Sequence, residues 1–289
     1  MIDIGNANLP EPFCNESFTL LKHGIYDDDE IDVYINESRD FAFLNPIPET
    51  DYTHYQPRVK NLNLTQYKEN LGLYQSRFEK IQRFIGDNKK LLEIGAMNAE
   101  FLSFINEKRK DLKLFCVEPD VDSKHLREQY KWLQQFTTIS EAKTSSYDVI
   151  SFFHVLEHII EPEKFFADCI SILAPGGNII IEVPALTDPL FSLYQISAYE
   201  NFFFQKQHPY YYSAKSLQRL LEKNGFEIIA MLPHQRYGLE NHLNWLHHGK
   251  PGGSEVYRQI FFTADVHYLT DLESSGNTDS VIAIAKLRA

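Results

Sequence analysis

Four histidines lie in segments where a side chain can reach a bound molecule: His154, His158, His208 and His242. A histidine beside a hydroxyl group can act as a general base close to neutral pH. We predict that His208 and His242 contact an acceptor molecule and that His154 is a third catalytic candidate. An ordinary hydrogen-bonded loop histidine is an equal alternative for His208 and His242. His158 follows Glu157 near an expected helix start, and we interpret it as structural.

A glycine and a carboxylate indicate a nucleoside-binding site. Gly95 directly follows the apolar segment 90–94, and a glycine at such a strand-to-helix turn lets the backbone approach a ligand closely. Glu118 directly follows the apolar segment 114–117, where a carboxylate can accept hydrogen bonds from the hydroxyls of a ribose. The further glycines of a dinucleotide fingerprint are missing from the turn, so the pattern favours a nucleoside over a pyrophosphate.

The composition argues against several other classes of protein. The formal net charge is -12, and no Lys/Arg-rich run offsets it, which disfavours nucleic acid as a partner. The cysteines Cys14, Cys116 and Cys169 lack the spacing of a zinc site or a disulfide framework. No convergent set of carboxylates is evident, so we predict no essential metal. Without a signal-like or membrane-spanning apolar segment, we expect a cytoplasmic location and no membrane insertion.

The elements that must position these residues alternate between strand and helix. Apolar segments predict strands at residues 90–94, 114–117, 136–139, 147–152, 179–183, 226–232 and 281–285. Helical spacing and helix-end signals predict helices at residues 67–85, 101–105, 121–132, 162–173 and 213–225. This alternation predicts an α/β fold with a doubly wound, mostly parallel sheet that is covered on both faces.

An extension and two insertions depart from this alternation. Residues 1–66 show no sustained period, and we expect an irregular N-terminal extension before a domain of residues 67–289. Insertions near residues 186–212 and 233–279 are long for plain connections, so we expect them to shape a binding surface. Aromatic residues around the extension would help to cover the pocket: Tyr52, Tyr55 and Tyr67.

Five successive motifs resemble those of class I S-adenosylmethionine-dependent methyltransferases. They are Glu93-Ile94-Gly95, Glu118-Pro119-Asp120, Tyr147-Asp148-Val149-Ile150, His154-Val155-Leu156-Glu157-His158 and Leu173-Ala174-Pro175-Gly176-Gly177. The resemblance spans roughly residues 67–232. It implies a Rossmann-like sheet of seven strands, with an antiparallel last strand at 281–287 inserted beside 226–232. It also implies S-adenosylmethionine as the cofactor.

The resemblance further assigns parts of the cofactor to residues of this chain. By this resemblance Gly95 and its neighbours hold the methionine part, Glu118 holds the ribose, and the segment around Ser140 holds the adenine. Phe153 and His154 would border the methionine and the sulfonium. The full set of implied cofactor contacts is Glu93, Gly95, Ala96, Met97, Glu118, Pro119, Ser140, Phe153 and His154.

The turn after the first strand departs from the family pattern. The family usually repeats glycine where this chain has Met97 and Ala99. Either the turn is remodelled or the affinity for the cofactor is reduced. The departure also leaves open a cofactor-binding module without catalysis.

The later aromatic segments indicate the acceptor. The segment Gln207-His208-Pro209-Tyr210 and residues 213–226 resemble methyltransferases that act on sugars or other small molecules. Residues 236–253 resemble a subgroup found in bacterial surface-polysaccharide gene sets. Aromatic rings and amides suit the apolar faces and hydroxyls of a sugar. The leading hypothesis is O-methylation of a sugar or sugar-nucleotide hydroxyl, and another small metabolite (a carboxylate, amine or ketide) is the alternative.

Overall fold

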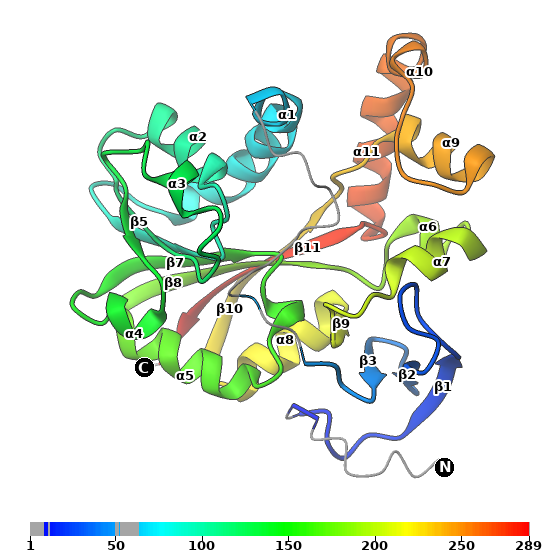
Figure 1. Ribbon diagram of the computed structural model, residues 1–289, viewed down its shortest axis with the longest axis horizontal. Coiled ribbons are helices and arrows are strands. Elements are labelled where there is room, and N and C mark those ends of the chain that lie inside the picture. Colours follow the sequence, from blue (N-terminus) through cyan, green and yellow to red (C-terminus); the bar gives the residue numbers. More distant parts are fainter. Residues whose placement is uncertain (1–8, 11, 50–51, 53–63, 289) are drawn as a thin grey trace.

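A seven-stranded sheet crosses the molecule (Figure 1). The computed structural model describes residues 9–10, 12–49, 52 and 64–288, with side chains from Asn70 in the last range. The strands of this sheet are β4 (Lys90–Ile94), β5 (Lys113–Val117), β6 (Gln134–Phe136), β7 (Tyr147–Phe153), β8 (Leu173–Pro184), β10 (Phe226–His234) and β11 (Ser280–Leu287). Their order is β10-β11-β8-β7-β4-β5-β6, parallel from β8 to β6, while β11 pairs antiparallel with both of its neighbours. This confirms the predicted doubly wound sheet with an antiparallel last strand.

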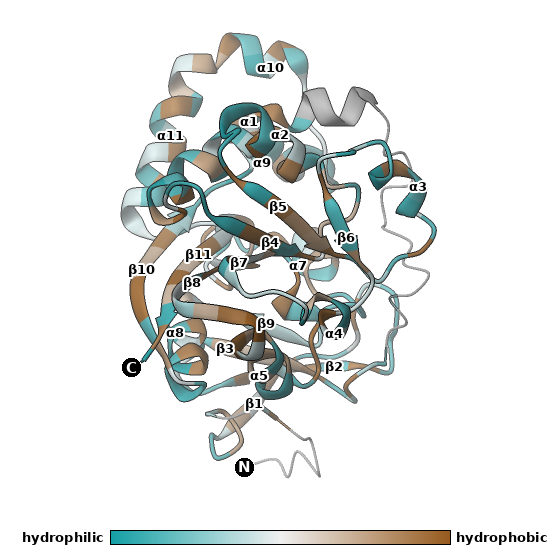
Figure 2. Cartoon of the chain, turned by 90° about the vertical axis from the view of Figure 1, so that its left-hand side faces the viewer, coloured by the Kyte–Doolittle hydropathy of each residue, from teal (hydrophilic) through white to brown (hydrophobic). Residues whose placement is uncertain are grey.

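Both faces of the sheet are buried, which explains why its central strands are continuous apolar segments. In β4, Leu91 and Leu92 join two different core clusters, because successive residues of a strand point to opposite faces. One face is covered by α1 (Leu64–Ile81) and α2 (Glu100–Lys108), the other by α5 (Pro162–Ile172) and α8 (Ala214–Lys223). Figure 2 shows hydrophobic residues along the strands and hydrophilic residues in outer turns such as that around α3 (Lys124–Arg127).

Two elements near the edge of the sheet differ from the sequence prediction. The helix expected at 121–132 is reduced to the single turn of α3, and the turn before it is held by the Asp120 carboxylate, which accepts the N–H of Ser123. The strand expected at 136–139 ends at Phe136. It cannot continue, because Thr138 caps the next helix, α4 (Ile139–Ala142), by accepting the backbone N–H of Glu141.

The N-terminal extension contains a second sheet. Its strands are β1 (Phe18–Lys22), β2 (Asp32–Asn36), β3 (Phe41–Asn45) and, from far along the chain, β9 (Tyr210–Tyr212), all antiparallel. Phe41 and Phe43 pack with Tyr210 and Tyr212 in the same core cluster as α5 and α8. The expectation of an irregular extension is wrong between residues 18 and 45, where three short strands pair in sequence order and the distant β9 adds the fourth. The division of the chain at residues 66 and 67 stays a prediction.

The two insertions form helices at the same end of the large sheet. The first holds α6 (Pro189–Ser192) and α7 (Ser197–Phe203), which lead into β9. The second holds α9 (Leu239–His248), α10 (Glu255–Ile260) and α11 (Phe262–Ser275), which project from the sheet as an arm (Figure 1). In the part of the chain that the structure describes, no helix is both long and apolar enough to span a membrane.

Candidate active site

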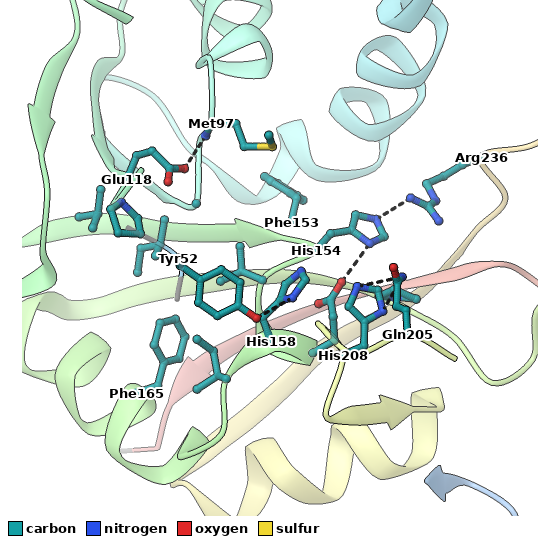
Figure 3. A pocket seen from close by; sticks show the side chains of 18 of the residues that line it. Tyr52, Met97, Glu118, Phe153, His154, His158, Phe165, Gln205, His208 and Arg236 are labelled. Atoms are coloured by element: carbon teal, nitrogen blue, oxygen red, sulfur yellow. Dashed lines mark hydrogen bonds and ion pairs between the residues drawn. The ribbon is translucent and has the colours of Figure 1, made fainter. Parts of the chain in front are cut away.

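The carboxyl ends of β4, β5 and β7 open into a cavity of about 600 Å³. A cavity of this size is typical of small-molecule sites, and the carboxyl edge of a doubly wound sheet is where such ligands bind. Figure 3 shows side chains from several elements that point into it. The residues predicted from sequence that line the cavity are Gly95, Met97, Glu118, Pro119, Phe153, His154 and His208.

The turn after β4 has a left-handed backbone at three positions. The φ angles are +75° at Gly95, 46° at Met97 and 58° at Ala99. A Cβ on Gly95 would lie 2.4 Å from Cγ2 of Val155, so the close approach requires glycine there. Met97 and Ala99 hold a conformation that costs an L residue about 1–2 kcal/mol. The chain thus keeps the backbone conformation that glycine favours, although it has side chains at both positions.

Glu118 is fixed by the backbone around it. Its Oε2 accepts the N–H of Met97 at 2.7 Å, and its Oε1 accepts the N–H of Asp120 at 3.0 Å (Figure 3). Burial raises the pKa of the Glu118 carboxyl above its usual value, and these two donors oppose the rise. Because a carboxylate has about four acceptor positions, Glu118 can still accept two hydroxyl donors from a ligand in the cavity.

The other implied cofactor contacts lie outside the cavity lining: Glu93, Ala96 and Ser140. Glu93 is buried, and burial raises its pKa to about 8, a rise that Arg77 opposes and Glu118 increases. Ser140 is exposed on α4, and the cavity is lined instead by the preceding residues 137–139. The segment predicted to hold adenine therefore reaches the cavity, but not through the residue named from the sequence.

His154 is in contact with a buried network of charged side chains. Oε2 of the fully buried Glu182 accepts from Nε of Arg77 at 2.6 Å, while its Oε1 lies 3.0 Å from Nδ1 of His234. Burial alone would raise the pKa of Glu182, but Arg77 and His234 hold it well below its usual value. Arg236 donates to Nε2 of His154 at 3.0 Å, and a guanidinium can only donate. The same Nε2 lies 3.2 Å from Glu182 Oε1, and the other ring nitrogen, Nδ1, faces Glu157 Oε1 at 3.4 Å.

The opposite half of the cavity gathers residues from distant segments. Glu157 and His158 come from the 3₁₀ turn Leu156–His158, Gln205 and His208 from the segment before β9, and Tyr52 from the extension. His158 Nδ1 donates to the Gln207 carbonyl at 2.7 Å, and the ring centroids of His158 and His208 are 4.6 Å apart. The Tyr52 hydroxyl lies 3.1 Å from His158 Nδ1 (Figure 3).

Glu157 is the acceptor-side residue that the sequence alone did not single out. Its side chain lines the cavity although the residue is only 1% exposed. Among the described residues, neither of its carboxylate oxygens has a hydrogen-bond partner. The available signal was the pair Glu157-His158 directly after the strand end at Phe153, where ligand-facing residues of such folds are placed.

His242 lies away from the cavity, contrary to the prediction that it contacts the acceptor. It is 1% exposed, and its Nδ1 is hydrogen-bonded to the hydroxyl of Tyr268 on α11. Burial lowers the pKa of His242 to about 4, and Asp279 opposes this fall. The physical reason is that the second insertion folds into packed helices and buries this face of α9.

The expected aromatic cover can be followed only in part. Tyr52 lines the cavity, and its hydroxyl also donates to the Gln207 carbonyl at 3.1 Å. Tyr55 and the side chain of Tyr67 lie outside the described residues.

The model of the methyltransferase domain family matches residues 67–231, more than half of the chain. This chain belongs to the methyltransferase domain family. No curated protein matches its sequence significantly.

Solved structures share the fold of this methyltransferase. One is a SAM-dependent methyltransferase from Archaeoglobus fulgidus, with 18% identity and a TM-score of 0.51, covering 78% of this chain and 100% of that chain. Another is the plantazolicin methyltransferase BpumL in complex with a triazolic desmethylPZN analog and SAH. It has 12% identity and a TM-score of 0.50, covering 78% of this chain and 89% of that chain. At these identities the likeness extends to the fold alone.

The methyltransferase fold implies S-adenosylmethionine, and the residues of the cavity fit that molecule. Gly95 lines the cavity without a side chain, and its turn packs directly against Val155. Glu118 offers a fixed carboxylate beside it, as a ribose requires. Phe153 and His154 complete the wall between this half and the half that holds His208.

Proposed function

We propose that this methyltransferase transfers a methyl group from S-adenosylmethionine to a small polar acceptor, most specifically a hydroxyl of a sugar or sugar nucleotide. The observation that carries the proposal is one continuous cavity with two chemically different halves. One half has the glycine turn and the carboxylate of a nucleoside site. The other has imidazoles, a carboxylate and aromatic rings.

The cofactor half would hold S-adenosylmethionine through a small set of groups. Glu118 would accept the ribose hydroxyls, residues 137–139 would face the adenine, and the turn at Gly95 and Met97 would face the methionine part. When bound, the cofactor supplies a methyl group already activated by its sulfonium. The protein then has to align the acceptor with that methyl and exclude water.

The acceptor half supports a hydroxyl-bearing ligand. Tyr199, Phe202 and Tyr237 line the cavity and offer ring faces on which a sugar can stack. Gln205 and Arg236 offer hydrogen-bond donors. A neutral hydroxyl is a poor nucleophile, and Glu157 and His208 lie where its proton can be taken up. His154, held by Arg236 and Glu182, would position the reacting groups rather than take the proton.

A different acceptor is favoured by one observation. The Arg236 guanidinium lines the cavity while it is held at 2.9 Å by Asp279, and a fixed guanidinium suits a carboxylate. A carboxylate-bearing metabolite is therefore the second candidate acceptor. The cytoplasmic location expected from the sequence remains a prediction.

The test is incubation of the full chain with methyl-labelled S-adenosylmethionine and a panel of nucleotide sugars, free sugars and carboxylic acids. The proposal predicts label in a sugar hydroxyl. Label found only in another class of acceptor would remove the sugar assignment. Cofactor binding by calorimetry without turnover on any acceptor would instead support a non-catalytic binding module.

A further inference from the structure

We propose that Glu157, His158 and His208 form a binding site for a divalent transition-metal cation in the acceptor half of the cavity. One carboxylate oxygen of Glu157 and one ring nitrogen of each histidine lie within 4.8 Å of one another. The sequence predicts no essential metal, because no convergent carboxylates were evident. The folded chain instead brings together two imidazoles and one carboxylate.

The chemistry of these three donors selects the class of cation. Two histidines with one carboxylate is the ligand set of catalytic zinc and of non-haem iron sites, whereas magnesium and calcium prefer oxygen donors alone. Such sites keep a coordination position open for water or substrate. The open side here is the cavity, because all three residues line it.

The surroundings of His158 match those of a metal ligand. A metal-binding histidine usually donates its other ring N–H to a carbonyl, carboxylate or water, which fixes the ring and its tautomer. His158 Nδ1 makes this bond to the Gln207 carbonyl at 2.7 Å, so its Nε2 is the atom that would bind the cation. The side-chain amide nitrogen of Gln205 lies 3.1 Å from Nδ1 and 3.3 Å from Nε2 of His208. It can only donate, so it leaves either ring nitrogen of His208 as the candidate ligand and is not an outer acceptor.

Glu157 gives the independent reason to expect a positive charge. A buried carboxylate is costly unless it is paired or hydrogen-bonded. In the described part of the chain its oxygens accept no hydrogen bond, and the ring of His154 lies beside it, with Nδ1 3.4 Å from Oε1. A cation between Glu157 and the two histidines would supply the missing charge from the cavity side.

The role of the cation rests on the proposed function, whereas its binding can be tested without cofactor or acceptor. A bound cation would orient an acceptor oxygen in the open position and lower the pKa of its hydroxyl. His208 would then act by holding the cation rather than by taking up the proton itself.

The test is titration of the chelator-treated full chain with Co²⁺, followed by the visible absorption of the bound ion and its displacement by Zn²⁺. We expect one equivalent of Co²⁺ with an absorption spectrum typical of nitrogen and oxygen ligands. Glu157→Gln and His208→Asn should each weaken Co²⁺ binding by at least about 100-fold, since loss of even an outer partner costs about 10- to 100-fold. Thermal unfolding of both variants shows whether they fold, and one folded variant is enough to test the loss of Co²⁺ affinity.

The matched control is the double variant His247→Gln and His248→Gln. It removes an exposed pair of imidazoles on α9 whose ring centroids are 4.3 Å apart. It should bind Co²⁺ as the unaltered chain does. The proposal is overturned if the unaltered chain takes up no Co²⁺, if the folded cavity variants keep its affinity, or if the control loses it. Binding of SAH is measured in the same samples. If the chain binds SAH but not Co²⁺, only the proposed cation site is wrong. If it binds Co²⁺ but not SAH, only the proposed cofactor is wrong.

Discussion

The two halves of the cavity are built in different ways. In the cofactor half, Gly95 and Glu118 each follow directly on a parallel strand of the same sheet. In the acceptor half, Tyr52, His158 and His208 come from an extension, a 3₁₀ turn and an insertion that meet only in the folded chain (Figure 3).

This difference suggests that the halves carry separable tasks. The cofactor half is shaped mainly by backbone, through a left-handed turn and a carboxylate held by two N–H groups. The acceptor half is shaped by side chains that can be replaced one at a time. Substitutions in one half should therefore alter methyl transfer and cofactor binding by different amounts.

The largest expected effect separates the halves directly. Glu157→Gln or His208→Ala should lower kcat by about 100- to 10,000-fold, because the acceptor hydroxyl is no longer activated, either by direct proton removal or through the proposed cation. The dissociation constant of S-adenosylmethionine should stay unchanged, since neither residue faces the cofactor half. Steady-state kinetics and calorimetry on the same preparations check this. A parallel loss of cofactor affinity would show that the halves are not separate.

The second effect concerns His242, which belongs to neither half. Its pKa of about 4 in the folded chain lies below the usual 6.5, because the buried ring is neutral. The unfolded chain therefore binds more protons between these values. The associated stability is fully present above pH 6.5 and is lost as the pH falls toward 4, by up to about 3 kcal/mol.

The variant His242→Gln should be less stable at pH 7 and should show a flatter loss of stability between pH 6.5 and 4. Chemical denaturation across this range measures the free energy of unfolding. The exposed His248→Gln variant should follow the unaltered chain. An unchanged pH profile in His242→Gln would mean that the imidazole is not buried as described.

The third effect tests the cofactor half. Glu118→Ala should weaken binding of S-adenosylmethionine by about 1–3 kcal/mol, through loss of charge-assisted hydrogen bonds to the ribose. Glu128→Ala, a nearby exposed carboxylate, is the control and should bind normally. Calorimetry decides, and equal dissociation constants for both variants would contradict the ribose assignment.

The smallest effect examines the left-handed turn. Ala99→Gly relieves about 1–2 kcal/mol of backbone strain but removes a buried methyl group worth about 0.8 kcal/mol. The free energy of unfolding should therefore change by less than about 1 kcal/mol. Ala142→Gly, buried in the helix α4, has no strain to relieve and should cost about 1–2 kcal/mol. Equal losses in the two variants would argue against strain at Ala99.

The same contrast explains what could be predicted from the sequence. Gly95 and Glu118 were predictable because each follows a strand that reads as an apolar segment, and strands of one parallel sheet end at one edge. The addition of β9 to the N-terminal sheet was not, because β3 finds this partner only through long-range pairing. The joint placement of Glu157 and His208 in the cavity was hidden for a similar reason.

The sequence around His242 carries a local signal of packing. This histidine stands three residues before Trp245 on α9, and both are buried on one helix face. That spacing is typical of a packed stripe rather than of a ligand contact. The prediction that His242 contacts the acceptor used only its residue type, whereas its helical spacing from Trp245 indicated packing.

The most direct measurement of the central claim is a crystal structure of the chain with SAH. We expect its ribose on the Glu118 carboxylate, its methionine part along the turn at Gly95, and its sulfur facing the half that contains His208. Density for SAH elsewhere, or a cavity that stays closed by side chains at saturating SAH, would contradict the account.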